Sequence, residues 1–382
     1  MTSTTEAKIN VRPGTRVFRA PGRVNLIGEH TDYNEGFVMP VAIGLSTWVK
    51  AFGRDDRTVS IFSENFSEPA EFDLDDKNLH AQGHWSDYVK GVAVTLERAG
   101  YRLRGAQLQI RGEVPIGSGL SSSAALEVAS AFALLTTSGI SIDRVELAKL
   151  CQQAENDFVG MRCGIMDQFA SSNGQVGNAL LLDCRSLEYK PVPLLKTARL
   201  AVCNTMVKHS LATSEYNARR LECEKAVRYF AERLPNVRAL RDVSDKELKS
   251  LGSDLPEVIY RRARHVITEN QRVLAAGAAL EQGDLSTFGH LMKSSHDSLR
   301  HDYEVSCKEL DLMVEIAQQV RGVFGSRMTG GGFGGSTVNL VAAQNVDEFK
   351  EVVSRSYQNA TGLSPEIYIC NAAGGVEEIF DL

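Results

Sequence analysis

Hydrophobic and polar residues follow two different periods along the chain, and these periods predict strands and helices in turn. In the N-terminal part, short apolar runs between turn residues predict strands at 17–20, 37–41, 45–52 and 58–62. Gly44 separates the second and third runs and predicts a turn between them. The four runs indicate a sheet whose strands are consecutive in sequence.

Helical spacing begins after residue 85. Apolar residues three and four positions apart predict a helix over 86–99 and another over 120–135, with a strand at 106–110 between them. Asp143 lies three residues before Glu146, the spacing of a capping box, so we expect a further helix to begin there.

The pattern changes after two prolines, Pro191 and Pro193, and we place a domain boundary near residue 195. The expected domains are 1–195 and 196–382. In the second domain the pattern predicts strands near 200–203, 337–341 and 366–370 and helices near 214–233, 256–282, 284–299, 307–320 and 346–357. Strands and helices are mixed without strict alternation, which favours an α+β fold.

Charge and cysteine usage exclude several classes of protein. The net charge of −6 argues against nucleic-acid binding, because nucleic-acid-binding surfaces are basic. Arginine clusters at 219–220 and 261–264 indicate solvated helix faces. Seven irregularly spaced cysteines without a CxxC pair indicate reduced thiols and no zinc site. With no signal-peptide core and no long apolar run, we expect a soluble cytoplasmic protein without membrane contacts.

Residues 115–125, PIGSGLSSSAA, form a glycine- and serine-rich turn between a predicted strand and a predicted helix. Glycines let the backbone turn tightly, and the start of a helix leaves N–H groups that can bind a phosphate. An ordinary serine-capped helix is the commoner structure for such a stretch taken alone.

A second glycine-rich run, 328–335, contains a formal GxGxxG pattern but precedes a strand, so the context of a dinucleotide-binding fold is missing. The Walker pattern is absent as well. The run fits either a plain glycine hairpin or a loop that lies close to a ligand.

Several polar residues suit chemistry but also suit ordinary structural roles. The run 29–32 fits polyol binding or a surface turn, and Asp167 fits a helix cap or a functional acid or base. Glu155 fits a solvent-facing residue or a ligand, and Trp85 fits a core residue or a stacking platform.

Taken together, the motifs closely resemble those of galactokinases, of the GHMP family of small-molecule kinases. PGRVNLIGEHTDYNEG at 21–36 is similar to the galactokinase signature, 115–125 to the phosphate-binding motif, and 328–335 to the third glycine-rich motif. Residues 163–169 and 214–220 are also galactokinase-like. A departure lies at 306–310, where an expected proline is missing.

The resemblance implies a ribosomal-protein-S5-like N-terminal domain and a ferredoxin-like C-terminal domain, with the active site in the cleft between them. It implies ATP-dependent phosphorylation of the C1 hydroxyl of α-D-galactose, the first committed step of galactose breakdown, with Mg²⁺ and without an obligate protein partner.

The resemblance also implies residue roles. Asp167 matches the catalytic base and Arg23 its cationic partner. The sugar-binding positions match Glu29, His30, Thr31, Asp32, Gly164 and Tyr216. The phosphate-binding positions match Gly117, Ser118, Gly119, Leu120, Ser121, Ser122 and Ser123. Trp85 matches an aromatic near adenine, and either Ser122 or Ser123, with Glu155, matches the Mg²⁺ ligands.

Two alternatives remain open from the sequence. A related kinase for N-acetylgalactosamine, arabinose or galacturonate would share these motifs. A galactokinase-like sugar sensor without activity is the other, but sensors of that type lack a Ser-Ala pair that is present here as Ser123-Ala124.

Overall fold

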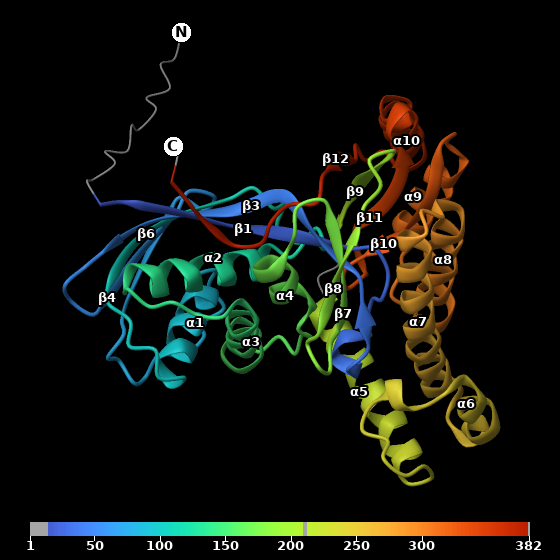
Figure 1. Ribbon diagram of the computed structural model, residues 1–382, viewed down its shortest axis with the longest axis horizontal. Helices are drawn as coiled ribbons and strands as arrows, with labels where there is room; N and C mark the ends of the chain where they lie inside the picture. Colours follow the sequence, from blue (N-terminus) through green and yellow to red (C-terminus); the bar gives the residue numbers. More distant parts are fainter. Residues whose placement is uncertain (1–13, 209–211, 381–382) are drawn as a thin grey trace.

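The computed structural model describes residues 14–208 and 212–380, and within them a large mixed sheet forms one half of the molecule (Figure 1). Its described strands have the order β13-β1-β3-β6-β4-β5. They are β1 (Arg16–Asn25), β3 (Pro40–Gly53), β4 (Thr58–Ser63), β5 (Glu68–Asp73), β6 (Ala106–Gly112) and β13 (Glu377–Ile379). The expectation of consecutive strands is wrong here, because β6 lies between β3 and β4 and runs parallel to β4.

Helices cover one face of this sheet (Figure 1). They are α1 (Asp87–Arg98), α2 (Ser122–Thr137), α3 (Arg144–Ala154) and α4 (Met166–Asn173). Apolar side chains from the sheet and the helices, among them Phe18, Val49 and Leu134, form one buried core. The carboxylate of Asp143 accepts hydrogen bonds from the backbone N–H groups of Val145 and Glu146, which confirms the expected start of α3.

Gly44 does not interrupt the sheet, so the predicted turn is wrong. β3 continues through it as one strand, although Gly44 lies in a bulge where the pairing with β1 passes from Ser46 to Ala42, and nothing lies within 4 Å of the position of its missing side chain. β13 was also not predicted. It pairs with β1, with Val17 opposite Ile379, and so joins the far end of the described chain to the first sheet.

The second half of the molecule contains an antiparallel sheet of four described strands in the order β10-β11-β9-β12. They are β9 (Ala198–Lys208), β10 (Val323–Thr329), β11 (Gly334–Ala342) and β12 (Glu366–Cys370), accompanied by α8 (Leu285–Ser298), α9 (Lys308–Gln319) and α10 (Val346–Thr361). Within this half the chain order across the sheet is second, third, first, fourth, as in ferredoxin-like β-α-β-β-α-β units.

A third sheet and three further helices accompany the two halves. A short sheet contains β2 (Phe37–Val38), β7 (Asn178–Asp183) and β8 (Tyr189–Pro193), and the helices α5 (Ala212–Ala231), α6 (Asp245–Leu251) and α7 (Glu257–Glu281) extend beside it. Figure 1 shows α7 and α8 side by side along the second sheet. The proposed domain boundary near 195 falls between β8 and β9 and stays a prediction.

The arginine clusters are not simply solvated faces. Arg219 and Arg262 are buried, and Arg262 forms ion pairs with Glu222 and Glu304 at 2.8 and 2.7 Å. A helical pattern does not distinguish such paired, buried arginines from exposed ones. None of the helices in the described ranges is both long and apolar enough to cross a membrane.

Candidate active site

Segments that are distant in sequence surround one cavity between the two halves, of about 1040 Å³ including its open side. The predicted site residues that line it are Arg23, Glu29, His30, Asp32, Gly117, Gly119, Leu120, Ser121, Ser122, Ser123, Glu155, Gly164, Asp167 and Tyr216. Gly330, Gly331 and Gly332, from the turn between β10 and β11, complete one wall. The glycine run is therefore a hairpin and a cavity wall at once.

Three predicted residues do not line this cavity, and one of them, Trp85, lines a second cavity instead. Thr31 is fully buried, and its hydroxyl is 2.8 Å from the carbonyl oxygen of Gly28 and 2.7 Å from that of Phe37. Ser118 donates from its hydroxyl to the carbonyl of Pro115. The structure gives both side chains partners within their own loops, which hold the loops in shape.

Arg23 lies at an irregularity in the pairing of β1 with β3. Pro21 pairs with Ser46 and Arg23 with Ala42, so the three β3 residues 43–45 bulge opposite the single β1 residue Gly22, and such a bulge redirects neighbouring side chains. Gly22 lies at this bulge, where a Cβ atom would be only 2.6 Å from the carbonyl oxygen of Leu120. A glycine is needed at this point because β1 and the serine-rich turn approach each other so closely.

The Asp167 carboxylate lies at the centre of a compact polar group. Arg23 donates to it twice, from Nε to Oδ1 and from Nη2 to Oδ2, both at 2.8 Å. The Ser121 hydroxyl donates to Oδ2 at 2.5 Å, and Arg23 also donates to the Gly119 carbonyl at 2.6 Å. The Arg23 side chain is 5% exposed and that of Asp167 25%, so the pair is partly shielded from water while the carboxylate still faces the cavity.

The serine-rich turn leaves the start of α2 uncapped. Ser121 has a left-handed backbone with φ of 61°, and neither its side chain nor any other in the described chain caps the helix. Its hydroxyl bonds to Asp167 instead. The commoner structure for this stretch, an ordinary serine cap, is therefore not the one formed. The N–H groups of the first helical turn and the positive end of the helix face the cavity, which suits an anion.

The two glycine-rich motifs contact each other through their backbones. Gly119 and Gly330 both have positive φ, and a Cβ atom on Gly330 would lie 2.7 Å from the Gly119 carbonyl oxygen. The Ser336 hydroxyl donates to the Ser118 carbonyl at 2.8 Å. Glycine is needed at Gly330 for this approach, which fixes the hairpin against the turn.

Asp32 and Gly164 form the wall beside Asp167. A Cβ atom on Gly164 would overlap the Asp32 carboxylate, so only glycine fits there. Burial, and then the nearby Asp167 carboxylate, raises the pKa of Asp32 to about 6. The Tyr33 N–H donates to Asp32 Oδ1 at 3.0 Å and holds the carboxylate in place.

Glu29 depends on two charged residues that were not singled out from the sequence. Its carboxylate forms an ion pair with the fully buried Arg327 on β10 and accepts a hydrogen bond from the Gly330 N–H at 3.0 Å. Glu269 on α7 lies 3.9 Å from Arg327 and accepts from the Gly28 N–H at 2.9 Å. Burial raises the pKa of Glu29, although Arg327 opposes this. No local sequence signal marks these partners, because each lies on a different element.

Glu155 lines the cavity and is buried, which excludes the alternative of a solvent-facing side chain. Burial, and then Asp167, raises the pKa of Glu155 to about 7, while a hydrogen bond from Ser123 lowers it. Gln168 donates from Nε2 to Glu155 at 2.6 Å and to Glu127 at 2.9 Å. Glu127 did have a sequence signal, because it is the only charged residue in the apolar stretch 120–135.

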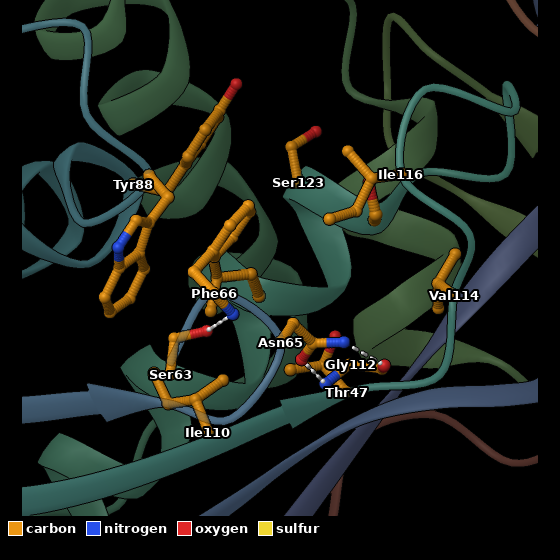
Figure 2. A pocket seen from close by; sticks show the side chains of 13 residues that line it. Thr47, Ser63, Asn65, Phe66, Tyr88, Ile110, Gly112, Val114, Ile116 and Ser123 are labelled. Atoms are coloured by element: carbon orange, nitrogen blue, oxygen red, sulfur yellow. Dashed lines mark hydrogen bonds between the residues drawn. The ribbon is translucent and has the colours of Figure 1, made fainter. Parts of the chain in front are cut away.

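A second cavity lies on the other side of the start of α2 and is mainly apolar. Ser122 and Ser123 line both cavities, so the two spaces meet at the N-terminus of this helix. Trp85 lines the second cavity and stacks on Phe66, with ring centroids 5.9 Å apart and an interplanar angle of 17°. Figure 2 shows further lining side chains, Tyr88, Ile110, Val114 and Ile116, around the same space.

Comparison with known proteins identifies the family. The galactokinase galactose-binding signature matches residues 6–51, and the N-terminal and C-terminal domains of GHMP kinases match residues 87–175 and 277–359. The galactokinase of Chloroflexus aggregans is 50% identical over 369 residues, covering 97% of this chain and 95% of that protein. This chain belongs to the galactokinase family of GHMP kinases.

Further relatives show the same similarity. The galactokinase of Halalkalibacterium halodurans is 45% identical over 381 residues, covering 99% of this chain and 96% of that protein. The crystal structure of Lactococcus lactis galactokinase complexed with galactose matches with a TM-score of 0.93 and 40% identity, covering 96% of each chain. Methanococcus jannaschii mevalonate kinase, at 18% identity and a TM-score of 0.67 over 95% of this chain and 100% of that one, shares the fold. The expected GHMP kinase architecture is confirmed.

Proposed function

We propose that this member of the galactokinase family transfers the terminal phosphoryl group of ATP to the C1 hydroxyl of α-D-galactose, giving galactose 1-phosphate and ADP. The observation that carries the proposal is the group formed by Asp167, Arg23 and Ser121 in a cavity walled by Glu29 and Asp32. A galactokinase of similar structure binds galactose, and the galactose-binding signature covers this wall.

Asp167 is the proposed acceptor for the proton of the sugar hydroxyl. A carboxylate has about four acceptor positions, and three of them accept hydrogen bonds from Arg23 and Ser121. One position remains for the substrate hydroxyl. Because the guanidinium balances the charge and fixes both oxygens, the carboxylate is oriented before the sugar arrives.

Arg23 has a second proposed role. Phosphoryl transfer depends on positioning and on neutralising the charge of the transferring group more than on covalent chemistry. The guanidinium lies between Asp167 and the Gly119 carbonyl of the serine-rich turn, so it borders both the sugar side and the phosphate side of the cavity. The free N–H groups at the start of α2 would bind the phosphates beside it.

Either Ser122 or Ser123, together with Glu155, suits a Mg²⁺ ion that arrives with the nucleotide. These side chains offer oxygen, which Mg²⁺ prefers, and the ion takes only one or two protein oxygens besides phosphates and water. The described residues contain no preformed cluster of three or more His, Cys, Asp or Glu side chains, which agrees with an ion held largely by phosphate. Bound there, Mg²⁺ would neutralise phosphate charge.

The apolar cavity is the proposed site of adenine. It adjoins the phosphate-binding start of α2 through Ser122 and Ser123, and Trp85 and Phe66 offer aromatic surface to a planar base. We also propose a cytoplasmic protein, because all seven cysteines lie in the described part of the chain and none is bridged. We propose that its partners are two small molecules, the sugar and ATP, and that it needs no obligate protein partner.

A coupled ADP-release assay over a panel of sugars tests the function. We expect galactose to give the highest kcat/KM among galactose, N-acetylgalactosamine, arabinose and galacturonate. Preference for another of these sugars would make the protein a related sugar 1-kinase. Binding of sugar and ATP without any turnover would instead indicate a sensor.

A further inference from the structure

We propose that Gln168 is a positioning residue for Glu155: its side-chain amide holds one oxygen of this carboxylate and leaves the other oxygen to a cation in the cavity. Glu127 anchors the same amide from α2. The contacts among these three side chains do not depend on the reaction, whereas the part of the inference that concerns Mg²⁺ rests on the proposed function.

Gln168 connects three elements that build the site. It lies on α4 directly after Asp167 and is fully buried. Its Nε2 donates to Oε2 of Glu155 at 2.6 Å and to Oε2 of Glu127, on α2, at 2.9 Å. An amide nitrogen carries two hydrogens, so each carboxyl group takes one of them. Gln168 thereby links the helix of the proposed base to the helix that begins at the serine-rich turn and to the proposed metal ligand.

Glu155 lies where the helix that carries it changes its winding. α3 ends at Ala154, and Glu155 begins a π-helical turn, η2 (Glu155–Val159), which ends at Gly160 with a φ of 90°. Such turns are rare and are frequent at functional sites, and their wider winding breaks the regular spacing of side chains along the helix. The contacts of Glu155 with other elements therefore matter for where its carboxylate lies.

The two oxygens of the Glu155 carboxylate have different surroundings. The Gln168 amide and the Cys163 thiol both donate to Oε2, at 2.6 and 3.3 Å, and Oε1 receives neither bond. The thiol is a weak donor that also lies 3.4 Å from Oδ1 of Asn156, so the amide makes the stronger contact. Glu155 lines the site cavity, whereas Gln168 lines neither this cavity nor the apolar one. The amide therefore reaches a ligand in the cavity only through Glu155.

Glu127 helps to keep the amide in place. Oε1 of Gln168 has no hydrogen-bond partner among the described residues, so the amide is held through its nitrogen. Glu127 is fully buried, and burial, followed by the nearby Glu155 carboxylate, raises the pKa of Glu127 well above its ordinary range. An uncharged carboxyl group there supplies an acceptor oxygen without adding a second negative charge beside Glu155.

Replacing Gln168 with methionine tests the proposal, because it removes the amide and keeps the length of the side chain. Calorimetry with ADP as the probe measures the ADP affinity without Mg²⁺ and the Mg²⁺ concentration that produces half of the tightening by the ion. This concentration should rise about tenfold, in the range that follows loss of an indirect metal partner, while the ADP affinity without Mg²⁺ stays at the wild-type value. An unchanged Mg²⁺ requirement would overturn the proposal, and so would an equal loss of ADP affinity with and without the ion.

Gln152→Met is the matched control. Gln152 lies on α3 and donates from Nε2 to the Cys163 carbonyl at 3.3 Å, and among the described residues it makes no hydrogen bond to Glu155. General loosening of this region would appear in both variants, whereas only Gln168→Met should change the Mg²⁺ requirement. An equal change in the two variants would refute the specific role of Gln168.

Two substitutions of Glu127 test the anchor while Gln168 stays intact, and they decide the question if Gln168→Met does not fold. Glu127→Gln keeps an uncharged acceptor oxygen, so its Mg²⁺ requirement should match that of the wild type. Glu127→Leu removes the acceptor and should reproduce most of the effect of Gln168→Met. Equal Mg²⁺ requirements in the two Glu127 variants would overturn the proposal.

Crystal structures of the wild type and of Gln168→Met, both without ligands, add a measurement that needs no Mg²⁺. We expect the Glu155 carboxylate to leave its wild-type position in the variant while the backbone of 155–164 stays in place. A Glu155 side chain in an unchanged position would overturn the proposal. If Mg²⁺ does not affect ADP binding in the wild type, the proposed role of the ion fails alone, because the crystal structures test the contacts without it.

Discussion

Replacing Gly22 with alanine tests whether the close approach of β1 to the serine-rich turn, at the bulge between β1 and β3, sets the position of the catalytic group. The alanine methyl would point at the backbone of the serine-rich turn, where the Leu120 carbonyl oxygen is 2.6 Å away. Two carbons of Val114 lie at 3.0 and 3.1 Å, so the methyl has no free direction in which to relax. Gly22 has no positive φ, so alanine adds crowding without backbone strain.

The expected loss of kcat/KM follows from the distance of 2.6 Å between the added Cβ and the Leu120 carbonyl oxygen. Since real Cβ atoms essentially never approach closer than 3.0 Å, β1 and the turn must separate by at least 0.4 Å, the difference between 3.0 and 2.6 Å. Arg23 follows Gly22 directly and donates its backbone N–H to the same Leu120 carbonyl at 3.1 Å. A displacement of 1 Å in a catalytic group costs about 100-fold, so we expect about a tenfold loss of kcat/KM here. Overpacking should also lower stability by about 1 to 3 kcal/mol.

The assay is coupled ADP release with galactose, together with chemical unfolding to measure stability. Gly44→Ala is the matched control, because Gly44 lies in the same bulge, on the β3 side opposite Gly22, but its Cβ would meet nothing within 4 Å. A kcat/KM for Gly22→Ala within twofold of wild type, with stability equal to that of the control, would refute the reasoning. Loss of stability without loss of activity would show that Arg23 is positioned independently of the bulge.

Three further predictions concern the carboxylates of the cavity. Asp167→Asn should abolish turnover while galactose binding, measured by calorimetry, largely survives, and near-normal turnover would exclude Asp167 as the base. Because the pKa of Asp32 is raised to about 6, this side chain gains a proton as the pH falls through 6. The kcat/KM for galactose should therefore decrease as the pH falls through this value. Asp32→Asn should remove this acidic limb of the pH profile. Glu155→Ala should raise the Mg²⁺ concentration needed for half-maximal activity, and an unchanged Mg²⁺ titration would count against this ligand.

Local sequence patterns predicted the elements that carry the site. The strand-turn-helix around 115–125 and the hairpin at 328–335 follow from glycine and serine between periodic segments, and both are present. The pattern misjudged Gly44 because it treats a glycine as a turn, whereas a glycine in a bulge with no crowding fits within a strand. Periodicity did not indicate which polar residues form the site. The family resemblance did.

The residues that support the site could not be predicted from the sequence, for a physical reason. Arg327 and Glu269 are charged residues on regular elements, and only the fold brings them to the buried carboxylate of Glu29. Tyr303, from the segment before α9, likewise reaches the Tyr33 hydroxyl, and Cys223, on α5, reaches Tyr303. Burial of a polar group needs a partner, and the partner is chosen by the tertiary structure rather than by neighbours in sequence.

The pairing of β13 with β1 has a consequence for how the chain is made. A ribosome releases the N-terminal segments first, yet the outer side of β1 finds its partner only when residues 377–379 have emerged. Until then the backbone N–H and C=O groups along that edge are open to other strands, including those of neighbouring nascent chains. A fragment that stops near residue 195 would keep this open edge permanently, so we expect it to aggregate unless residues 377–379 are supplied as a separate peptide.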